Sequence, residues 1–400
     1  MRLFGKIFLS LVLCGVTAPI SFAQGKDDFN PVQTGVTSLG IAPDARSAAM
    51  GDLGAATDPD VNSQFWNPSK YPFAYSRGAI GISYTPWLRK IVDDIYLAYL
   101  SGYWKVGAED NQAISASLRY FSLGEVTTTP PGDTGGGQSL NPYEMSVDVG
   151  YSRKLSESYS MGIVFRYIYS DLGFSESYVG DQSTGASAFA ADISGYYTSY
   201  PIVGRSECQW SWGWNISNIG TKVSYNHGEN PAFLPTNLRI GTTFTFPLAN
   251  YHNLSLGLDL NKLLVPIMPR RVDYEDGTDG EIAYVKAYEK WQDMSPITGI
   301  FKSFSDAPGG FSEELREIGV SLGAEYSYNQ QFFLRGGYYY QNPKKGNQQY
   351  FGIGAGFALN VLRLDASYMV ATAETSPLDQ TLRFTLTFDM DGIKEIFGKK

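Results

Sequence analysis

Long segments of this sequence alternate apolar and polar residues with a period of two. In residues 143–151 the odd positions are Tyr, Met or Val, whereas the even positions are Glu, Ser, Asp and Gly. Residues 318–326 and 381–388 alternate in the same way. Because successive side chains of a β-strand point to opposite faces, the pattern predicts strands with one apolar and one polar face.

Alternation of this kind predicts an all-β fold with fourteen strands. The predicted strands are 78–85, 92–104, 112–123, 143–154, 158–170, 187–199, 207–218, 236–246, 252–260, 316–328, 332–341, 350–359, 361–371 and 380–389. Most are near the roughly 9 to 11 residues that a tilted transmembrane strand needs. We therefore predict a 14-stranded antiparallel outer-membrane β-barrel.

The connections between these strands alternate in length. The short turns are 105–111, 155–157, 200–206, 247–251, 329–331 and the corner at Asn360. The other connections are 86–91, 124–142, 171–186, 219–235, 261–315, 342–349 and 372–379, and all but the first exceed most of the short turns. Outer-membrane barrels have short periplasmic turns and longer outer loops. With an even number of strands, we expect both termini in the periplasm.

Composition favours the barrel over a soluble β-sandwich, which also alternates apolar and polar residues. The chain has 28 Tyr, 23 Phe and 43 Gly but only 18% charged residues, which suits strands with one face in lipid. Sandwich strands are also usually shorter, at about five or six residues. The net charge of −9 and the lack of a basic stripe argue against a nucleic-acid partner.

The first 23 residues have the pattern of a secretion signal. Two basic residues precede an apolar run that ends in a small-x-small cleavage site at residues 21–23. A lipoprotein signal at Cys14 is the weaker alternative, because Leu13 stands where that motif has a small residue. Cleavage after Ala23 leaves Cys208 as the only cysteine, so we expect no intramolecular disulfide.

Charged residues on the polar strand faces are predicted to point into the lumen. On the lipid face near the midplane, an Arg side chain would cost about 2 to 4 kcal/mol. The predicted lumen charges are Arg119, Glu144, Asp148, Arg166, Asp259, Glu325, Arg363, Asp365 and Arg383. Fourteen strands enclose more space than their own side chains fill, so the lumen requires a plug if it is not to leak.

Residues 43–71, "PDARSAAMGDLGAATDPDVNSQFWNPSKY", have the properties of such a plug. Pro59 and Pro68 prevent a long helix, and the many Ala and Gly residues allow close packing inside a tube. The charged residues of the segment can pair with lumen charges. The predicted hatch residues are Asp44, Arg46, Gly51, Asp52, Gly54, Asp58, Trp66, Asn67 and Pro68.

This segment resembles the N-terminal hatch of the FadL-like outer-membrane barrels, which have fourteen strands. The stretches "GVTSLGIAPDARSAAMGD", "FWNPSKYPF" and "ISYTPWLRKIVDDIYLAYLSGYWKV" more closely resemble the PorV family of the type IX secretion system of Bacteroidota. The resemblance covers essentially the mature chain. Its most specific part is the N-terminal hundred residues.

The resemblance implies a shuttle protein that makes and breaks no covalent bonds. Proteins of this family are expected to bind the C-terminal signal domain of secreted cargo at the translocon barrel (SprA/Sov-type). They deliver it to a surface complex of the sortase PorU with PorQ and PorZ, which attaches cargo to lipopolysaccharide. The alternative is a FadL-like importer of hydrophobic small molecules, although the short first outer loop, "PWLRKI", departs from that pattern.

The long connection 261–315 is the most informative outer element. It begins with the apolar "NKLLVPIMPRR" and contains two predicted helices, at 283–294 and 295–304. Connections of this length are usually functional or disordered. Its apolar residues either fold back as a lid over the barrel or form a docking surface for translocon or cargo. The predicted docking residues are Phe233, Leu234, Leu263, Leu264, Ile267 and Met268.

We predict no cofactor, metal or catalytic residue. The acidic run 273–281 lacks the spacing of an EF-hand loop, so a solvated loop is the simpler interpretation. The glycines of "FGIGAGF" alternate along one strand, without the helix that a phosphate site needs. His227 and His252 fall at opposite ends of the predicted barrel, so a lipid hydrolase is the weakest alternative.

The predicted organisation has four parts. Residues 1–23 are the signal peptide, and 24–76 are an N-terminal periplasmic segment with the lumen hatch. Residues 77–389 are the transmembrane barrel, and 390–400 are a periplasmic tail.

Overall fold

A computed structural model describes residues 29–87, 94–107, 109–128, 138–172, 185–225, 230–372 and 380–392. The predicted signal peptide, most of the first outer connection, His227 and the tail from residue 393 lie outside the described residues. Within the described ranges, none of the helices has the length and apolar character to cross a membrane.

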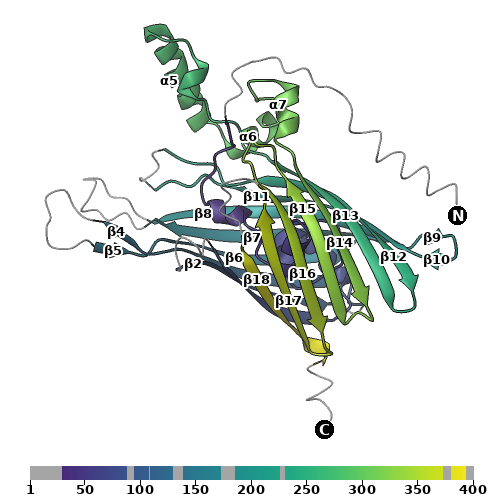
Figure 1. Ribbon diagram of the computed structural model, residues 1–400. Coiled ribbons are helices and arrows are strands. Elements are labelled where there is room, and N and C mark those ends of the chain that lie inside the picture. Colours follow the sequence, from purple (N-terminus) through teal and green to yellow (C-terminus); the bar gives the residue numbers. More distant parts are fainter. Residues whose placement is uncertain are drawn as a thin grey trace.

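Fourteen antiparallel strands close into a barrel, as predicted (Figure 1). The strands are β1 (Gly78–Pro86), β2 (Ile95–Val106), β3 (Gln112–Leu123), β6 (Tyr143–Lys154), β7 (Tyr159–Asp171), β8 (Ala186–Ser199), β11 (Gln209–Gly220), β12 (Asn237–Ala249), β13 (His252–Leu263), β14 (Gly319–Tyr328), β15 (Phe332–Tyr340), β16 (Gln349–Ala358), β17 (Leu362–Ala371) and β18 (Leu382–Asp389). Each strand pairs with the next, and β1 pairs with β18 to close the sheet. Closure matters because an open edge in hydrocarbon leaves backbone groups without partners.

The remaining elements lie before the barrel and in its connections. The segment before β1 contains η1 (Thr37–Gly40), α2 (Ala45–Ala49), α3 (Ser63–Trp66) and η2 (Pro68–Phe73). The connection between β13 and β14 contains η3 (Arg271–Asp273), α5 (Thr278–Gln292), α6 (Pro296–Lys302) and α7 (Phe311–Arg316). Two small hairpins, β4 (Val126–Thr128) with β5 (Gln138–Leu140) and β9 (Ile202–Val203) with β10 (Ser206–Glu207), extend two other connections.

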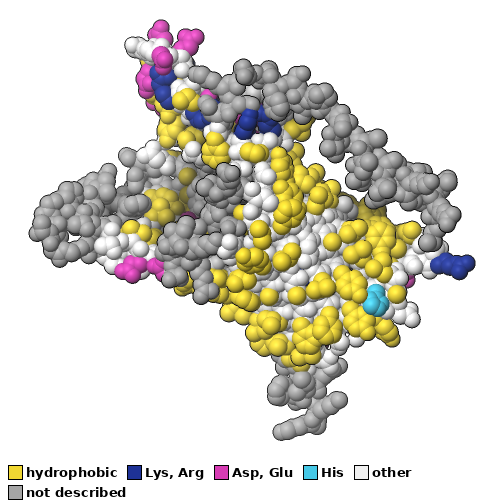
Figure 2. Space-filling model, viewed as in Figure 1, with side chains coloured by type: hydrophobic (Ala, Val, Ile, Leu, Met, Phe, Trp, Pro, Cys, Tyr) yellow, Lys and Arg dark blue, Asp and Glu magenta, His cyan; other side chains and the backbone are white. Residues whose placement is uncertain are grey.

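The barrel is apolar on its outside and polar within. In β1, Ile80, Ile82 and Tyr84 are exposed, whereas the alternate residues Ser83 and Thr85 are buried. Hydrophobic side chains therefore cover the wall, while charged ones gather at the end that carries α5 (Figure 2). This arrangement suits a wall that faces lipid on one side and a packed lumen on the other.

The N-terminal segment enters the barrel from the end that carries the long connections. The Asn30 N–H donates to the Lys344 carbonyl at 2.8 Å, and the Gly35 N–H donates to the Phe233 carbonyl at 2.8 Å. Val36 and Leu39 are buried in a cluster with residues of the β7, β8 and β11–β12 region. The prediction that the whole of 24–76 lies on the short-turn side is therefore wrong for residues 29–41. The apolar residues Val36 and Leu39 are buried by strands β7 and β8 and by the long connection after β11.

Candidate functional site

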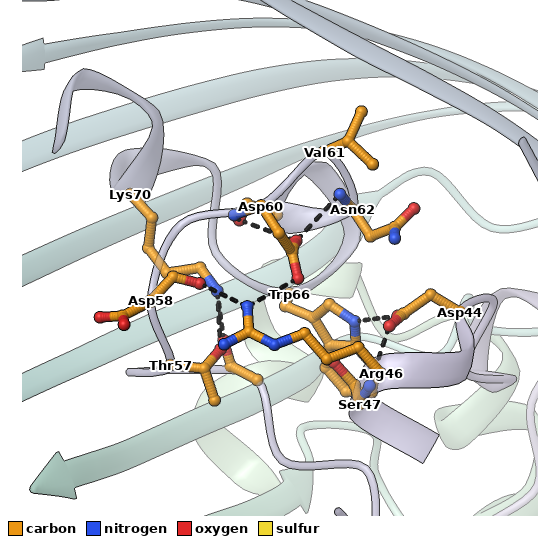
Figure 3. A network of polar contacts seen from close by, with 12 residues as sticks. Asp44, Arg46, Ser47, Thr57, Asp58, Asp60, Val61, Asn62, Trp66 and Lys70 are labelled. Carbon is orange, nitrogen blue, oxygen red and sulfur yellow. Dashed lines mark hydrogen bonds and ion pairs between the residues drawn. The ribbon is translucent and has the colours of Figure 1, made fainter. Parts of the chain in front are cut away.

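The hatch is a compact plug inside the barrel, built from short elements between residues 44 and 73. Asp44 begins α2, since its carboxylate accepts the Ser47 N–H at 2.9 Å. The second oxygen of Asp44 accepts the Trp66 indole N–H at 2.6 Å, which ties α2 to α3 (Figure 3). Gly51 and Asp52, both with positive φ, then end the first helix. These turns fold the small-residue run into a space that one long helix could not fill.

Arg46 connects the hatch to the barrel wall. It donates to Glu325 of β14 from Nε at 3.0 Å and from Nη2 at 2.9 Å. Its Nη1 bonds the Asp58 carbonyl at 2.9 Å and the Asp60 carboxylate at 3.0 Å (Figure 3). Glu325 also binds Arg335 of β15 at 2.6 Å, so the ion pairs continue along the wall. Two strands and the hatch therefore share one buried charge network.

Backbone groups of the hatch are satisfied by the wall as well. Asp259 of β13 accepts the N–H groups of Gly54 and Ala55, each at 2.8 Å. Asn67 donates to the Ala55 carbonyl at 2.8 Å and to the Gly195 carbonyl of β8 at 3.0 Å. Since a buried backbone group without a partner destabilises a fold, these bonds hold the irregular segment in one conformation.

Glycines in the wall let the hatch backbone touch the strands. A Cβ at Gly337 would overlap the backbone of Met50, and one at Gly352 would overlap the Ala48 carbonyl. On the other side of the hatch, a Cβ at Gly213 would overlap the Ala55 carbonyl. The wall and the plug are therefore complementary in shape at three separate strands.

Most other predicted lumen charges are buried and paired. Arg166 binds Asp148 at 2.8 Å and Asp192 at 2.9 Å. Arg119 donates to the carbonyls of Ser38 and Ile41. Arg383 lies 3.6 Å from Asp52, and Arg363 lies 2.8 Å from Asp365.

The predicted hatch residues divide into those that meet the wall and those that act within the plug. Arg46 and Asp52 pair with wall charges, and Asp58 accepts from the Gln209 side chain at 2.8 Å. Asp44 instead caps α2 and binds Trp66 within the hatch. Pro68 begins η2, directly after Asn67.

Several functional residues were missed from the sequence. Arg335 and Asp192 are inward-facing ion-pair residues on β15 and β8, where apolar residues on both faces obscure the alternation. Asp60 and Lys70 stabilise the hatch internally, and Lys70 donates to the Gly54 carbonyl at 2.9 Å. The local signal is the prolines of the same stretch, with Pro59 directly before Asp60 and Pro68 and Pro72 two residues to either side of Lys70.

The hatch separates two cavities. The cavity on the outer side has a volume of about 300 Å³, and its lining includes Leu39, Asp52, Trp87, Arg239, Tyr339 and Arg383. The cavity on the short-turn side has a volume of about 450 Å³, and its lining includes Arg46, Asp60, Tyr103, Phe333, Arg363 and Asp389. No described residue lines both cavities.

The predicted docking residues are packed beneath the long outer connection. Phe233, Leu234 and Leu264 are buried, and Leu263, Ile267 and Met268 are half-buried. Phe233 and Val265 form a core with Trp291 of α5. The packing therefore agrees with the fold-back alternative for these six residues, and their role in docking stays a prediction. They are the packed base of a lid, because the connection folds back over its own apolar start.

The exposed apolar surface of this connection lies on its short helices. Ile297 and Phe301 of α6 are 63% and 73% exposed, one helical turn apart. A Cβ at Gly299, on the opposite face of α6, would lie 3.1 Å from the Phe233 ring. The buried base thus supports a helix whose outer face is apolar.

Asp306 anchors the start of the lid, which is the connection between β13 and β14. Its carboxylate accepts the Ile267 N–H at 2.8 Å. Burial, together with the nearby acidic Glu314 and Glu317, raises the pKa of Asp306, although the hydrogen bond from Ile267 opposes the rise. Folding of the connection therefore favours the protonated form of this carboxyl group.

The remaining candidate groups are the acidic side chains and His252. Among the described ranges, no three His, Cys, Asp or Glu side chains are grouped as a metal site. His252 shares a hydrogen bond of 2.6 Å with the Tyr326 hydroxyl, at the short-turn end of β13 and β14.

Solved structures with similar chain traces include two toluene transporters and a FadL homologue. The Pseudomonas putida toluene transporter TodX is 12% identical, with 90% of this chain and 99% of that chain covered and a TM-score of 0.48. The Ralstonia pickettii toluene transporter TbuX is 12% identical, with 88% and 98% covered and a TM-score of 0.45. A FadL homologue of Pseudomonas aeruginosa is 10% identical, with 87% and 99% covered and a TM-score of 0.42. Because these TM-scores are below 0.5, no functional assignment rests on them.

The family comparison is specific. No curated protein matches the chain. The family model described as "Type IX secretion system protein PorV" matches residues 24–270, more than half of the chain. The chain belongs to the PorV family, and it is therefore an outer-membrane β-barrel protein of the type IX secretion system.

Proposed function

We propose that this barrel is a docking shuttle for secreted cargo. It binds the C-terminal signal domain of cargo at the translocon barrel (SprA/Sov-type) and carries it to the surface complex of the sortase PorU with PorQ and PorZ. The short turns and the C-terminal tail face the periplasm, and the long connections face outward, next to lipopolysaccharide. The observation that carries the proposal is the hatch, which closes the lumen through buried ion pairs.

The closed lumen favours docking over import of hydrophobic small molecules. An importer needs a continuous path, whereas the two cavities lie on opposite sides of the hatch and share no lining residue among those described. Moving the hatch would also break the contacts of Arg46 with Glu325 and of Asp259 with Gly54. Breaking one buried charge pair typically destabilises a fold by about 3 to 5 kcal/mol.

The outer face of α6 supplies a surface on which a protein could dock. Ile297 and Phe301 are exposed in spite of their apolar side chains. Large exposed apolar side chains that cluster on one helix face are typical of protein-binding sites. In this proposal Phe233, one of the predicted docking residues, supports the inner side of α6 at Gly299.

The test is capture of partners by variants of the α6 face. We expect Ile297→Ser with Phe301→Ser to reduce recovery of a cargo signal domain, or of the translocon barrel, by at least about tenfold, which corresponds to 1.4 kcal/mol. Ile282→Ser is the matched control, because Ile282 of α5 is 61% exposed but lies on another helix. Full recovery of cargo and translocon by the α6 variant, with the barrel correctly folded, would contradict α6 as the docking surface.

Mass spectrometry of the tagged wild-type barrel, purified from native membranes, tests the shuttle itself. We expect both a large translocon barrel and cargo with C-terminal signal domains. Recovery of neither, combined with uptake of a hydrophobic small molecule, would favour the importer.

A further inference from the structure

Helix α7 exposes its apolar side chains and buries acidic ones, which is the reverse of an ordinary surface helix. Phe311 and Leu315 are 77% and 52% exposed, whereas Glu314 and Glu317 beside them are buried. A surface helix normally buries its apolar face, whereas the described part of this chain leaves the apolar side chains of α7 uncovered.

The buried acidic side of α7 is held by two lysines of the barrel rim. Lys262 of β13 lies 2.9 Å from Glu314 and 2.5 Å from Glu317. Lys345, from the β15–β16 connection, lies 3.1 Å from Glu317 and 2.5 Å from Glu313. These ion pairs fix the orientation of α7, so its apolar side faces away from the two lysines.

Lys262 also shows where α7 lies relative to the wall. It shares the outward face of β13 with Leu258 and Leu260, which are 37% and 42% exposed on the lipid side. Lys262 is nevertheless buried, because Glu314 and Glu317 cover its amine and the Phe304 ring lies 6.0 Å away. The α7 region therefore sits above the lipid-facing side of the wall.

The apolar row of α7 continues into the lipid face of β14. Phe311 and Leu315 lie one turn apart on α7, and the half-buried Ile318 follows in the link to β14. Val320 and Leu322 continue on the outward face of the strand. Glu317 faces the other way, into the lining of the outer cavity. The exposed apolar row therefore runs directly from the helix onto a surface that faces hydrocarbon.

We propose that α7 is an interfacial helix in the outer leaflet. It buries Phe311 and Leu315, together with the neighbouring Phe304, against lipid acyl chains. The occupant is lipid because the row is continuous with the lipid face of the barrel and begins at its rim. Short amphipathic segments bind membranes in this way, with the apolar face just below the headgroups. The paired lysines and glutamates keep the charged side of the helix away from the acyl chains. This inference does not depend on the shuttle proposal.

The experiment places a fluorophore on α7 of the full mature chain in pure lipid vesicles. Phe311→Cys in a Cys208→Ser background is labelled with an environment-sensitive dye and reconstituted in phosphatidylcholine with brominated acyl chains. We expect bromine to quench the dye by at least about half, and aqueous iodide to quench it little. Leu315→Cys provides a second position in case the first variant folds poorly.

The control position is Ile297 of α6, which is 63% exposed on a different helix. We expect a dye at Ile297→Cys to be quenched by iodide and not by brominated lipid. Strong iodide quenching at both α7 positions, without quenching by brominated lipid, would overturn the proposal. Equal bromine quenching at position 297 would also overturn it, because α7 would then not be the specific lipid contact. No partner protein is present in these vesicles, so quenching by bromine reports lipid alone.

Discussion

The guanidinium of Arg46, in the hatch, forms two parallel hydrogen bonds with the carboxylate of Glu325, in the barrel wall, at 3.0 and 2.9 Å. The two residues are 279 positions apart in the chain. Both are buried, and their pairing joins the plug to the strand that follows the long outer connection. A bidentate pair of this kind is geometrically specific as well as strong, so it fixes the register of the hatch in the lumen.

Replacing Arg46 is predicted to loosen the plug. Arg46→Gln leaves Glu325 and Asp60 without one of their cations, and breaking a buried pair costs about 3 to 5 kcal/mol. We expect a lower denaturant midpoint and faster efflux of a small dye from reconstituted vesicles. The matched control is Arg271→Gln, which removes an exposed pair with Glu281 that is worth at most about 1 kcal/mol. Equal efflux from both variants would show that Arg46 does not secure the hatch.

Two adjacent glycines of β15 are predicted to respond differently to the same substitution. A methyl group at Gly337 overlaps the backbone of Met50, whereas one at Gly336 meets no atom within 4 Å. We expect Gly337→Ala to lower the free energy of unfolding by about 1 to 3 kcal/mol, as overpacked sites do. Gly336→Ala should change it by no more than about 0.5 kcal/mol. Similar unfolding curves for the two variants would mean that the hatch does not contact the wall at Gly337.

The start of the described chain is predicted to be accessible from the cell surface. Phe29 lies just before the residues that bond to the outer connections, whereas Leu155 is in a short turn at the opposite end, and both are 60% exposed. In a Cys208→Ser background, we expect an impermeant maleimide to label Phe29→Cys on intact cells. Leu155→Cys should be labelled only after the outer membrane is permeabilised. The reverse result would place the long connections in the periplasm.

The lid is predicted to become more stable as the pH falls through the raised pKa of Asp306. Burial raises this pKa above that of an ordinary aspartate, so the folded lid binds more protons than the unfolded lid between these two pKa values. Its stability therefore decreases as the pH rises through that window. Asp306→Asn should remove the dependence while keeping an acceptor for the Ile267 N–H.

Hydrogen exchange of the lid amides, corrected for the intrinsic effect of pH, measures this difference. We expect wild-type protection of the segment around Ile267 to increase from pH 7 to pH 4, and the protection in Asp306→Asn to stay constant. A parallel pH dependence in the two proteins would assign the effect to another group.

The strand pattern made the barrel predictable. Alternation in segments such as residues 143–151 records which side of a strand is buried, and this is a local property of the chain. For the same reason, alternation predicts inward charges such as Asp148 and Arg383, and both side chains are buried in the structure. Where both strand faces carry apolar residues, as around Arg335, the pattern does not indicate which face is buried. The inward charge of Arg335 was therefore missed.

The sequence by itself determined the number of strands, their two faces, and the presence of a small-residue plug, because each follows from residues close together in the chain. Only the tertiary structure decided that Arg46 meets Glu325, that Asp44 binds Trp66 instead of the wall, and that residues 29–41 lie among the outer connections. It likewise decided that Leu264 is buried and Phe311 exposed. These outcomes depend on contacts between distant segments, and such contacts exist only once the barrel has closed around the hatch.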